Sequence, residues 1–186
     1  MTGSSPLLSV AWRILAGLSL LLALGLGVGL VLPGTWEARR STVVAAPPDS
    51  VFEHLDVLER WKGWTPWSDV EVTTSGPSRG PGATMMWDDP FAGRGAFRIV
   101  TSRSPERMEY RVDVEGGLSV IGTFDLEPVA GGTRVSWTEQ GDFGWNPLMS
   151  WAALTMGRVQ GAQLEQGLVR LATVVRTGAL PETSPR

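Results

Sequence analysis

Few ionisable side chains of this sequence are expected to face its interior, and Glu139 is the one best placed for chemistry. Glu139 shares one face of a predicted strand with Val135 and Trp137, so its carboxylate is expected to point toward the covered side of a sheet. Burial there would raise the pKa of the carboxyl group, which suits a ligand contact or a general acid. The alternative, that Glu139 lies at the strand end and faces solvent, stays open.

Asp88, Tyr110 and His54 are the other residues that could take part in a reaction. Asp88 and Tyr110 fall on the predicted inward faces of their strands, although Asp89 and Pro90 indicate a turn beside Asp88. In an enzyme, either a pocket carboxylate or Tyr110 would shuttle protons. His54 is expected to be exposed on a short helix, and no G-x-S-x-G motif is present to supply a nucleophile for it.

The composition excludes several classes of site. The chain has no cysteine and one histidine, so we expect no metal site and no cofactor, and we assign no catalytic residue. The formal net charge is -3, and no run of Lys and Arg occurs, so we expect no nucleic-acid partner.

Residues 14–32 form an uncharged run of 19 residues, bracketed by Trp12 and Trp36. Such a run spans about 30 Å as a helix, the thickness of a bilayer's hydrocarbon core, and Trp favours the membrane interface. We therefore predict a polar tail and single-pass membrane anchor at 1–36. A cleaved signal peptide would have a shorter apolar region and a small-x-small cleavage site. Nearly equal positive charges on the two sides leave the membrane side of the following domain undetermined.

Gly25 and Gly29 form a G-x-x-x-G pair inside this run. That spacing lets two membrane helices approach closely, so a homodimer through these glycines is one expectation. The other is that both glycines reflect the general abundance of Gly in membrane helices.

The remainder predicts one α+β domain at 37–178, followed by a polar tail at 179–186 that we expect to be flexible. A short amphipathic helix is predicted to begin at Pro48. Apolar and polar residues alternate in several segments, which predicts antiparallel strands with one covered face. The strands are expected at 37–45, 70–74, 83–88, 95–102, 107–115, 119–127 and 133–140.

A long helix at 147–176 is predicted to cover the sheet. Its second half has an apolar stripe formed by Leu164, Leu168, Leu171 and Val175. Its first half contains small residues, including Gly157 and Gly161. Small residues there either leave space beside the sheet or allow close packing, and both alternatives stay open.

The order of these elements resembles the helix-grip fold of the START-like (SRPBCC) superfamily, in particular its polyketide cyclase/dehydrase-like branch. The first matching stretch contains an extended segment and then Ala-Pro-Pro-x-x-Val-Phe at 46–52. The likeness covers nearly all of residues 37–176. The segments that carry it are 40–52, 61–68, 95–100, 106–112, 132–137 and 165–171.

The resemblance implies a deep apolar cavity between a curved sheet and the last helix, holding a lipid, sterol, polyketide or quinone-like molecule. The alternative is a core filled with side chains, since aromatic residues and Met are common in cores. The residues predicted to bind the ligand are Trp64, Trp67, Met86, Asp88, Met108, Tyr110, Phe124, Trp137, Glu139 and Met156.

Three functions fit these features. The first is a membrane-anchored domain that binds a hydrophobic small molecule or lipid without catalysis. The second is an enzyme of the cyclase/dehydrase type that acts on a hydrophobic substrate. The third is a non-enzymatic, partner-binding subunit that assembles through Gly25 and Gly29.

Overall fold

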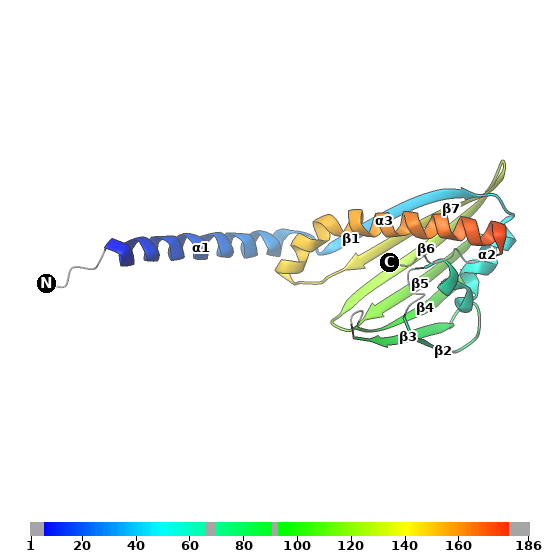
Figure 1. Ribbon diagram of the computed structural model, residues 1–186, viewed down its shortest axis with the longest axis horizontal. Coiled ribbons are helices and arrows are strands. Elements are labelled where there is room, and N and C mark those ends of the chain that lie inside the picture. The colour runs from blue at the N-terminus through cyan, green and yellow to red at the C-terminus, as the bar shows by residue number, and fades with distance from the viewer. Residues whose placement is uncertain (1–5, 66–69, 91–92, 179–186) are drawn as a thin grey trace.

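The computed structural model describes residues 6–65, 70–90 and 93–178. In this part of the chain, seven antiparallel strands form one sheet, and a long C-terminal helix lies along it (Figure 1). The elements in chain order are α1 (Pro6–Val31), β1 (Thr35–Val44), α2 (Pro48–Asp56), η1 (Leu58–Gly63), β2 (Val72–Ser75), β3 (Thr84–Asp89), β4 (Gly93–Arg103), β5 (Arg107–Val114), β6 (Leu118–Val129), β7 (Gly132–Asp142) and α3 (Pro147–Thr177). This is the predicted α+β helix-grip arrangement, and every predicted strand is present.

The sheet has the order β1-β7-β6-β5-β4-β3-β2, so the first strand lies beside the last one. From β2 to β7, strands that are consecutive in the sequence are neighbours in the sheet. The turn between β6 and β7 uses Gly131 and Gly132 at positive φ, a conformation that other residues rarely adopt. Inward residues alternate with outward ones along β5 to β7, which gives the sheet one covered face.

Helix α2 and the short helix η1 close one end of the sheet (Figure 1). Pro48 fits the first turn of α2, where a missing N–H costs nothing. Asp56 at the end of α2 is buried, and it accepts hydrogen bonds from Arg79 Nε at 3.0 Å and Ser102 Oγ at 2.7 Å. These bonds join α2 to β4 and to the β2–β3 connection, which gives this buried carboxylate a structural role.

Helix α3 is capped at both ends. Asn146 accepts hydrogen bonds from the backbone N–H groups of Leu148 and Met149, and Gly178 ends the helix in the left-handed conformation. The predicted apolar stripe is buried, although it ends on Val174, while Val175 is only partly buried. The stripe consists of Leu164, Leu168, Leu171 and Val174.

The small residues of α3 allow close packing against the sheet. A Cβ atom at Gly157 would lie 2.6 Å from the backbone oxygen of Glu37, and one at Gly161 would lie 2.5 Å from the guanidinium of Arg40. The structure therefore decides between the two alternatives for the first half of this helix. The glycines bring α3 onto β1.

Candidate functional site

Tyr110, Gly122 and Glu139 form one row across β5, β6 and β7. Tyr110 pairs in register with Gly122, and Gly122 pairs with Glu139. A Cβ atom at Gly122 would collide with Cζ of Tyr110, so the hydroxyl end of the tyrosine side chain lies over this glycine. The absence of a side chain on β6 thus lets Tyr110 reach past the intervening strand, and its hydroxyl donates a hydrogen bond to Glu139 Oε1.

Two further side chains complete this polar group. The indole Nε1 of Trp137 donates to the Tyr110 hydroxyl at 2.8 Å. The Gln160 side-chain amide, on α3, donates to Glu139 Oε2 at 2.5 Å. Each carboxylate oxygen of Glu139 therefore has a donor, as a buried carboxylate requires.

Burial dominates the electrostatics of the pair. Glu139 is 6% exposed, and desolvation raises its pKa above the ordinary 4.5, although the hydrogen bonds from Tyr110 and Gln160 act in the opposite direction. Desolvation, and then the nearby charge of Glu139, raise the pKa of Tyr110 well above 10.0. Tyr110 thus remains protonated at neutral pH. The carboxyl group of Glu139, whose pKa is raised from its ordinary value, is the member of the pair that exchanges a proton at lower pH.

A small pocket of about 50 Å³ opens beside this polar group, between the sheet, η1 and α3. Its floor carries the polar atoms of Tyr110 and Glu139, and its rim includes the half-buried Gln160 and the exposed Gln163. The residues that line it are Trp61, Thr65, Tyr110, Trp137, Glu139, Gln160, Gln163 and Leu164.

Aromatic rings fill the interior beneath this pocket. Trp61 contacts Trp64 with ring centroids 4.7 Å apart and Phe97 at 4.5 Å, and Phe124 stacks on Trp137 at 4.8 Å. Two of the buried indole N–H groups bond to the backbone, because Trp61 donates to the Leu55 carbonyl and Trp64 to the His54 carbonyl. The deep cavity implied by the resemblance is therefore absent from the described residues, where side chains occupy its place. These side chains are Trp61, Trp64, Phe97, Tyr110, Phe124 and Trp137.

Most of the residues predicted from the sequence to bind a ligand do face the interior. Tyr110, Trp137 and Glu139 line the pocket, and Met156 of α3 is partly buried against the core. Trp64, Met108 and Phe124 are fully buried within the core, away from the pocket lining. Trp67 lies outside the described residues.

The prediction for β3 was wrong. Met86 is 40% exposed, and Asp88 is exposed with an ion pair to Arg94, whereas Met85 is the residue of this strand that is buried. Because a turn adjoins Asp88, the sequence pattern does not define which residues of this strand face inward. A shift by one residue exchanges the two faces of a strand.

Gln160, Thr65 and Gln163 were missed because the sequence offers no motif for them. Gln160 lies near the middle of α3, and its contact with Glu139 depends on how the helix packs on the sheet. Helical spacing does indicate the face of Gln160, because this residue lies one turn before Leu164 and therefore on the same side of α3 as the buried stripe.

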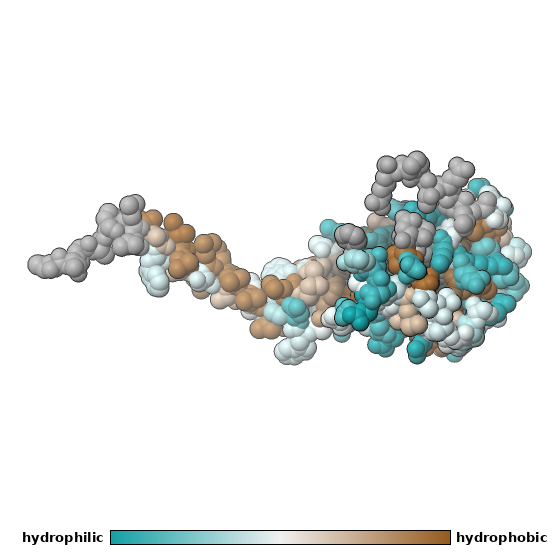
Figure 2. All heavy atoms as spheres, turned by 60° about the horizontal axis from the view of Figure 1, so that its bottom comes forward, coloured by the Kyte–Doolittle hydropathy of each residue, from teal (hydrophilic) through white to brown (hydrophobic). Residues whose placement is uncertain are grey.

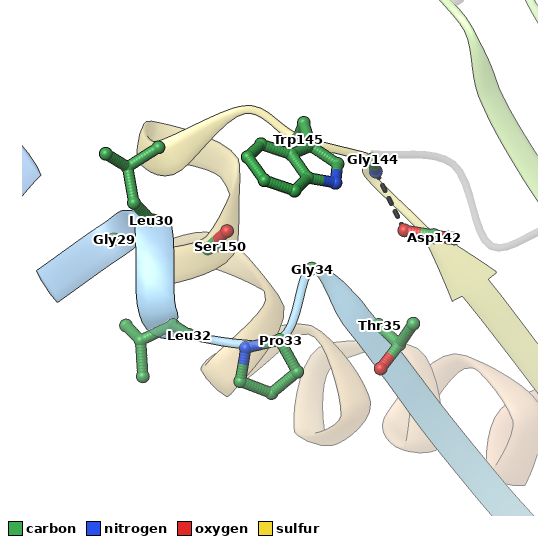
Figure 3. Close-up of a pocket in the computed structure, with 10 residues that line it drawn as sticks. All are labelled: Gly29, Leu30, Leu32, Pro33, Gly34, Thr35, Asp142, Gly144, Trp145 and Ser150. Carbon is green, nitrogen blue, oxygen red and sulfur yellow. Dashed lines mark hydrogen bonds between the residues drawn. The ribbon is translucent and has the colours of Figure 1, made fainter. Parts of the chain in front are cut away.

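A second pocket, of about 310 Å³, lies between the end of α1 and the start of α3 (Figure 3). Its lining comes from the end of α1, the connection to β1, and the loop between β7 and α3. In that loop, the Gly144 N–H donates to Asp142 Oδ1 at 2.7 Å.

Comparison with known proteins agrees with the fold. The family model described as polyketide cyclase/dehydrase and lipid transport matches residues 35–176. Among solved structures, the protein CV1439 from Chromobacterium violaceum matches with a TM-score of 0.56 at 21% identity, over 75% of this chain and 96% of that chain. A search of the curated proteins gave no significant match.

Two other similar structures come from biosynthetic settings. DynU16, from the dynemicin biosynthetic locus, matches with a TM-score of 0.57 at 18% identity, over 77% of this chain and 48% of that chain. The di-domain ARO/CYC protein StfQ, from the steffimycin biosynthetic pathway, matches with a TM-score of 0.57 at 18% identity, over 78% of this chain and 52% of that chain. The chain thus spans about half the length of each, and identities this low show the fold alone.

Proposed function

Because the chain belongs to the polyketide cyclase/dehydrase and lipid transport family, we propose that it is a membrane-tethered domain that binds a lipophilic small molecule and holds the polar end of that molecule at Glu139. The observation that carries this proposal is the buried Tyr110–Glu139 pair at the floor of a small pocket, beside the apolar side chains of Trp61, Trp137 and Leu164. A few convergent polar groups in an apolar lining are typical of small-molecule sites.

The pocket is large enough for only one end of a ligand. Small-molecule sites usually measure about 300–1,000 Å³, whereas this pocket of about 50 Å³ holds only a hydroxyl or carbonyl end. A larger ligand requires α3 side chains to move aside. Gln160 and Gln163 are the rim side chains suited to this, because they are long, unbranched and not fully buried. Gln160 would then release Glu139 Oε2 to the ligand.

Helix α1 supports the membrane tether. Its apolar part, Val10–Val31, has 22 residues and spans about 33 Å, enough to cross a hydrocarbon core. Its side chains are exposed, and apolar residues follow one another along it (Figure 2). The end of α1 also packs on α3, because Trp151 Nε1 donates to the Gly25 carbonyl at 3.0 Å. A segment built into the folded domain in this way favours a retained anchor over a cleaved signal peptide.

A tether gives such a domain a functional advantage. A lipophilic ligand is concentrated in the membrane, and an anchored pocket is held close to that source, which raises the effective concentration. The homodimer predicted through Gly25 and Gly29 stays a prediction.

A second function, proton-transfer catalysis on a hydrophobic substrate, is favoured by the raised pKa of Glu139. A carboxyl group with a raised pKa exchanges protons closer to neutral pH, which suits a general acid or base. Tyr110 and Gln160 would then position the Glu139 carboxyl group.

Binding can be tested with the full chain in phosphatidylcholine nanodiscs. Native mass spectrometry and solvent extraction would look for a co-purified lipophilic molecule, and thermal unfolding would be followed with 1-naphthol and with naphthalene. We expect 1-naphthol, which has a hydroxyl group, to raise the melting temperature more than naphthalene does. Glu139→Gln should reduce this difference. Asp88→Asn, at an exposed carboxylate, serves as the matched control and should leave the difference between the two probes unchanged.

The proposal is wrong if no lipophilic molecule co-purifies and the two probes shift the melting temperature equally. Catalysis is distinguished from binding by Glu139→Gln when a turnover assay exists. Loss of turnover with retained binding would favour the enzyme.

A further inference from the structure

Helix α3 begins alongside α1, away from the sheet (Figure 1). Two contacts fix this arrangement. Trp151 donates its indole N–H to the Gly25 carbonyl, and a Cβ atom at Gly29 would collide with the backbone of Pro147. The first turns of α3 therefore pack directly on the last two turns of α1.

These contacts determine how deep the start of α3 lies if α1 crosses a bilayer. Gly25 is six residues before Val31, the end of α1, which corresponds to about 9 Å along the helix. Gly25 also lies within the apolar span Val10–Val31. Trp151, bonded to the carbonyl of Gly25, is consequently at a level inside the hydrocarbon core.

The residue composition at the start of α3 is compatible with a position inside the membrane. Between Asp142 and Arg158 the sequence has no charged residue. Large apolar side chains are also exposed there, with Trp145 93%, Leu148 63% and Leu154 55% exposed. An exposed apolar surface of this kind indicates a site of contact with a protein or a membrane. Trp residues are favoured at the membrane interface.

We propose that Trp145–Leu154 is immersed in the bilayer beside α1 and forms a second membrane contact of the domain. This inference rests on the proposed membrane tether. The partner is a lipid surface, because the segment contacts the end of the α1 span at two points, with the Trp151 indole at Gly25 and Pro147 at Gly29. The pocket between α1 and α3 then opens at the level of the lipid headgroups, with Trp145 and Leu30 on its wall (Figure 3).

This contact also orients the Glu139 pocket. Gln160, on the pocket rim, lies nine residues after Trp151, about 14 Å further along α3. The pocket is thus held just outside the bilayer, and a lipophilic molecule leaving the membrane has a short path to it.

The absence of cysteine makes a site-specific test direct. The full-length variants Leu148→Cys and Leu154→Cys would be labelled with the fluorophore NBD and reconstituted into phosphatidylcholine vesicles. Quenching by aqueous iodide and by doxyl-labelled phosphatidylcholine would then be measured. Leu21→Cys reports on the α1 span, and Val169→Cys, an equally apolar and exposed position on the other half of α3, is the matched control.

We expect the probes at 148 and 154 to lose iodide quenching and gain doxyl quenching, as at 21, while the probe at 169 shows the opposite. If only the probe at 21 is quenched by doxyl lipid, α1 is an anchor and the second contact is wrong. If the probes at 148 and 154 are shielded from iodide without doxyl quenching, a protein surface covers them, and the lipid proposal is wrong. If the probe at 21 is also open to iodide, the tether itself is wrong.

Discussion

The side chains of Tyr110 and Glu139 are hydrogen-bonded across Gly122, although their strands are not neighbours in the sheet. The row of three residues places a phenol and a carboxyl group in a buried, largely apolar setting. Both groups have raised pKa values there. The site thus depends on one residue without a side chain as much as on the two residues that have functional groups.

Gly122→Ala should disrupt this row. The added methyl group would overlap the ring of Tyr110, so we expect a loss of about 1–3 kcal/mol in the free energy of unfolding. Chemical denaturation of the full chain in detergent measures this loss. Thr123→Ala, at the next residue and on the other face of β6, is the control with a smaller expected effect. Equal losses for the two variants would contradict the packing described here.

Tyr110→Phe should raise the pKa of Glu139 further. The hydroxyl of Tyr110 donates to the carboxylate and so favours its charged form, and removing the hydroxyl removes that effect. The variant also leaves the Trp137 N–H without its acceptor, at a cost of about 1–3 kcal/mol. Infrared titration of the carboxyl C=O stretch, assigned with Glu139→Gln, would show the shift. An unchanged pKa would mean that Tyr110 does not donate to Glu139.

Tyr110 can be titrated without any substitution, because it is the only tyrosine of the chain. Burial and the nearby Glu139 hold its pKa well above 10.0, so the folded protein should show little tyrosinate absorbance at that pH. The unfolded protein in guanidinium should be about half ionised at the same pH. Half ionisation of the folded protein near pH 10.0 would show that Tyr110 is not in this buried environment.

Glu139 should make the protein lose stability as pH rises. Its pKa is higher in the folded state than the ordinary 4.5 of the unfolded state, so the folded state binds more protons between these two values. The stabilising contribution is therefore complete below about pH 4.5 and is lost as pH rises through the folded-state pKa. The free energy of unfolding of the wild type, relative to that of Glu139→Gln, should fall as pH rises from about 4.5 through the folded-state pKa of Glu139. The control Asp88→Asn should show the same pH dependence of stability as the wild type. A difference that stays constant with pH would contradict the raised pKa.

Replacing two glycines of α3 by alanine should change the stability of the protein in opposite directions. Gly157→Ala places a methyl group against the Glu37 carbonyl, a backbone atom that cannot move away, so we expect destabilisation of about 1–3 kcal/mol. Gly161→Ala meets only the end of the Arg40 side chain, which can swing aside, so the better helix propensity of Ala should give a gain of up to about 1 kcal/mol. Thermal unfolding of both variants tests this, and a loss at 161 as large as that at 157 would contradict it.

The sequence predicted the elements and most of the inward residues because alternation and helical spacing are local properties. The seven strands, the closing helix and the inward positions of Tyr110, Trp137 and Glu139 follow from periods of two and of about four residues. Local patterns failed at β3, where Met86 and Asp88 were predicted inward and lie outward. That short strand follows a glycine-rich turn, and nothing local fixes its register.

By itself, then, the sequence determined the order of elements, the family resemblance, the apolar N-terminal span and the candidate carboxylate at Glu139. Only the tertiary structure decided that aromatic rings fill the interior, that Gln160 reaches Glu139, and that the start of α3 packs on α1. The physical reason is distance along the chain. Which side chains meet between Gly25 and Trp151, or between Tyr110 and Glu139, depends on how whole strands and helices pack, and no short window of sequence contains that information.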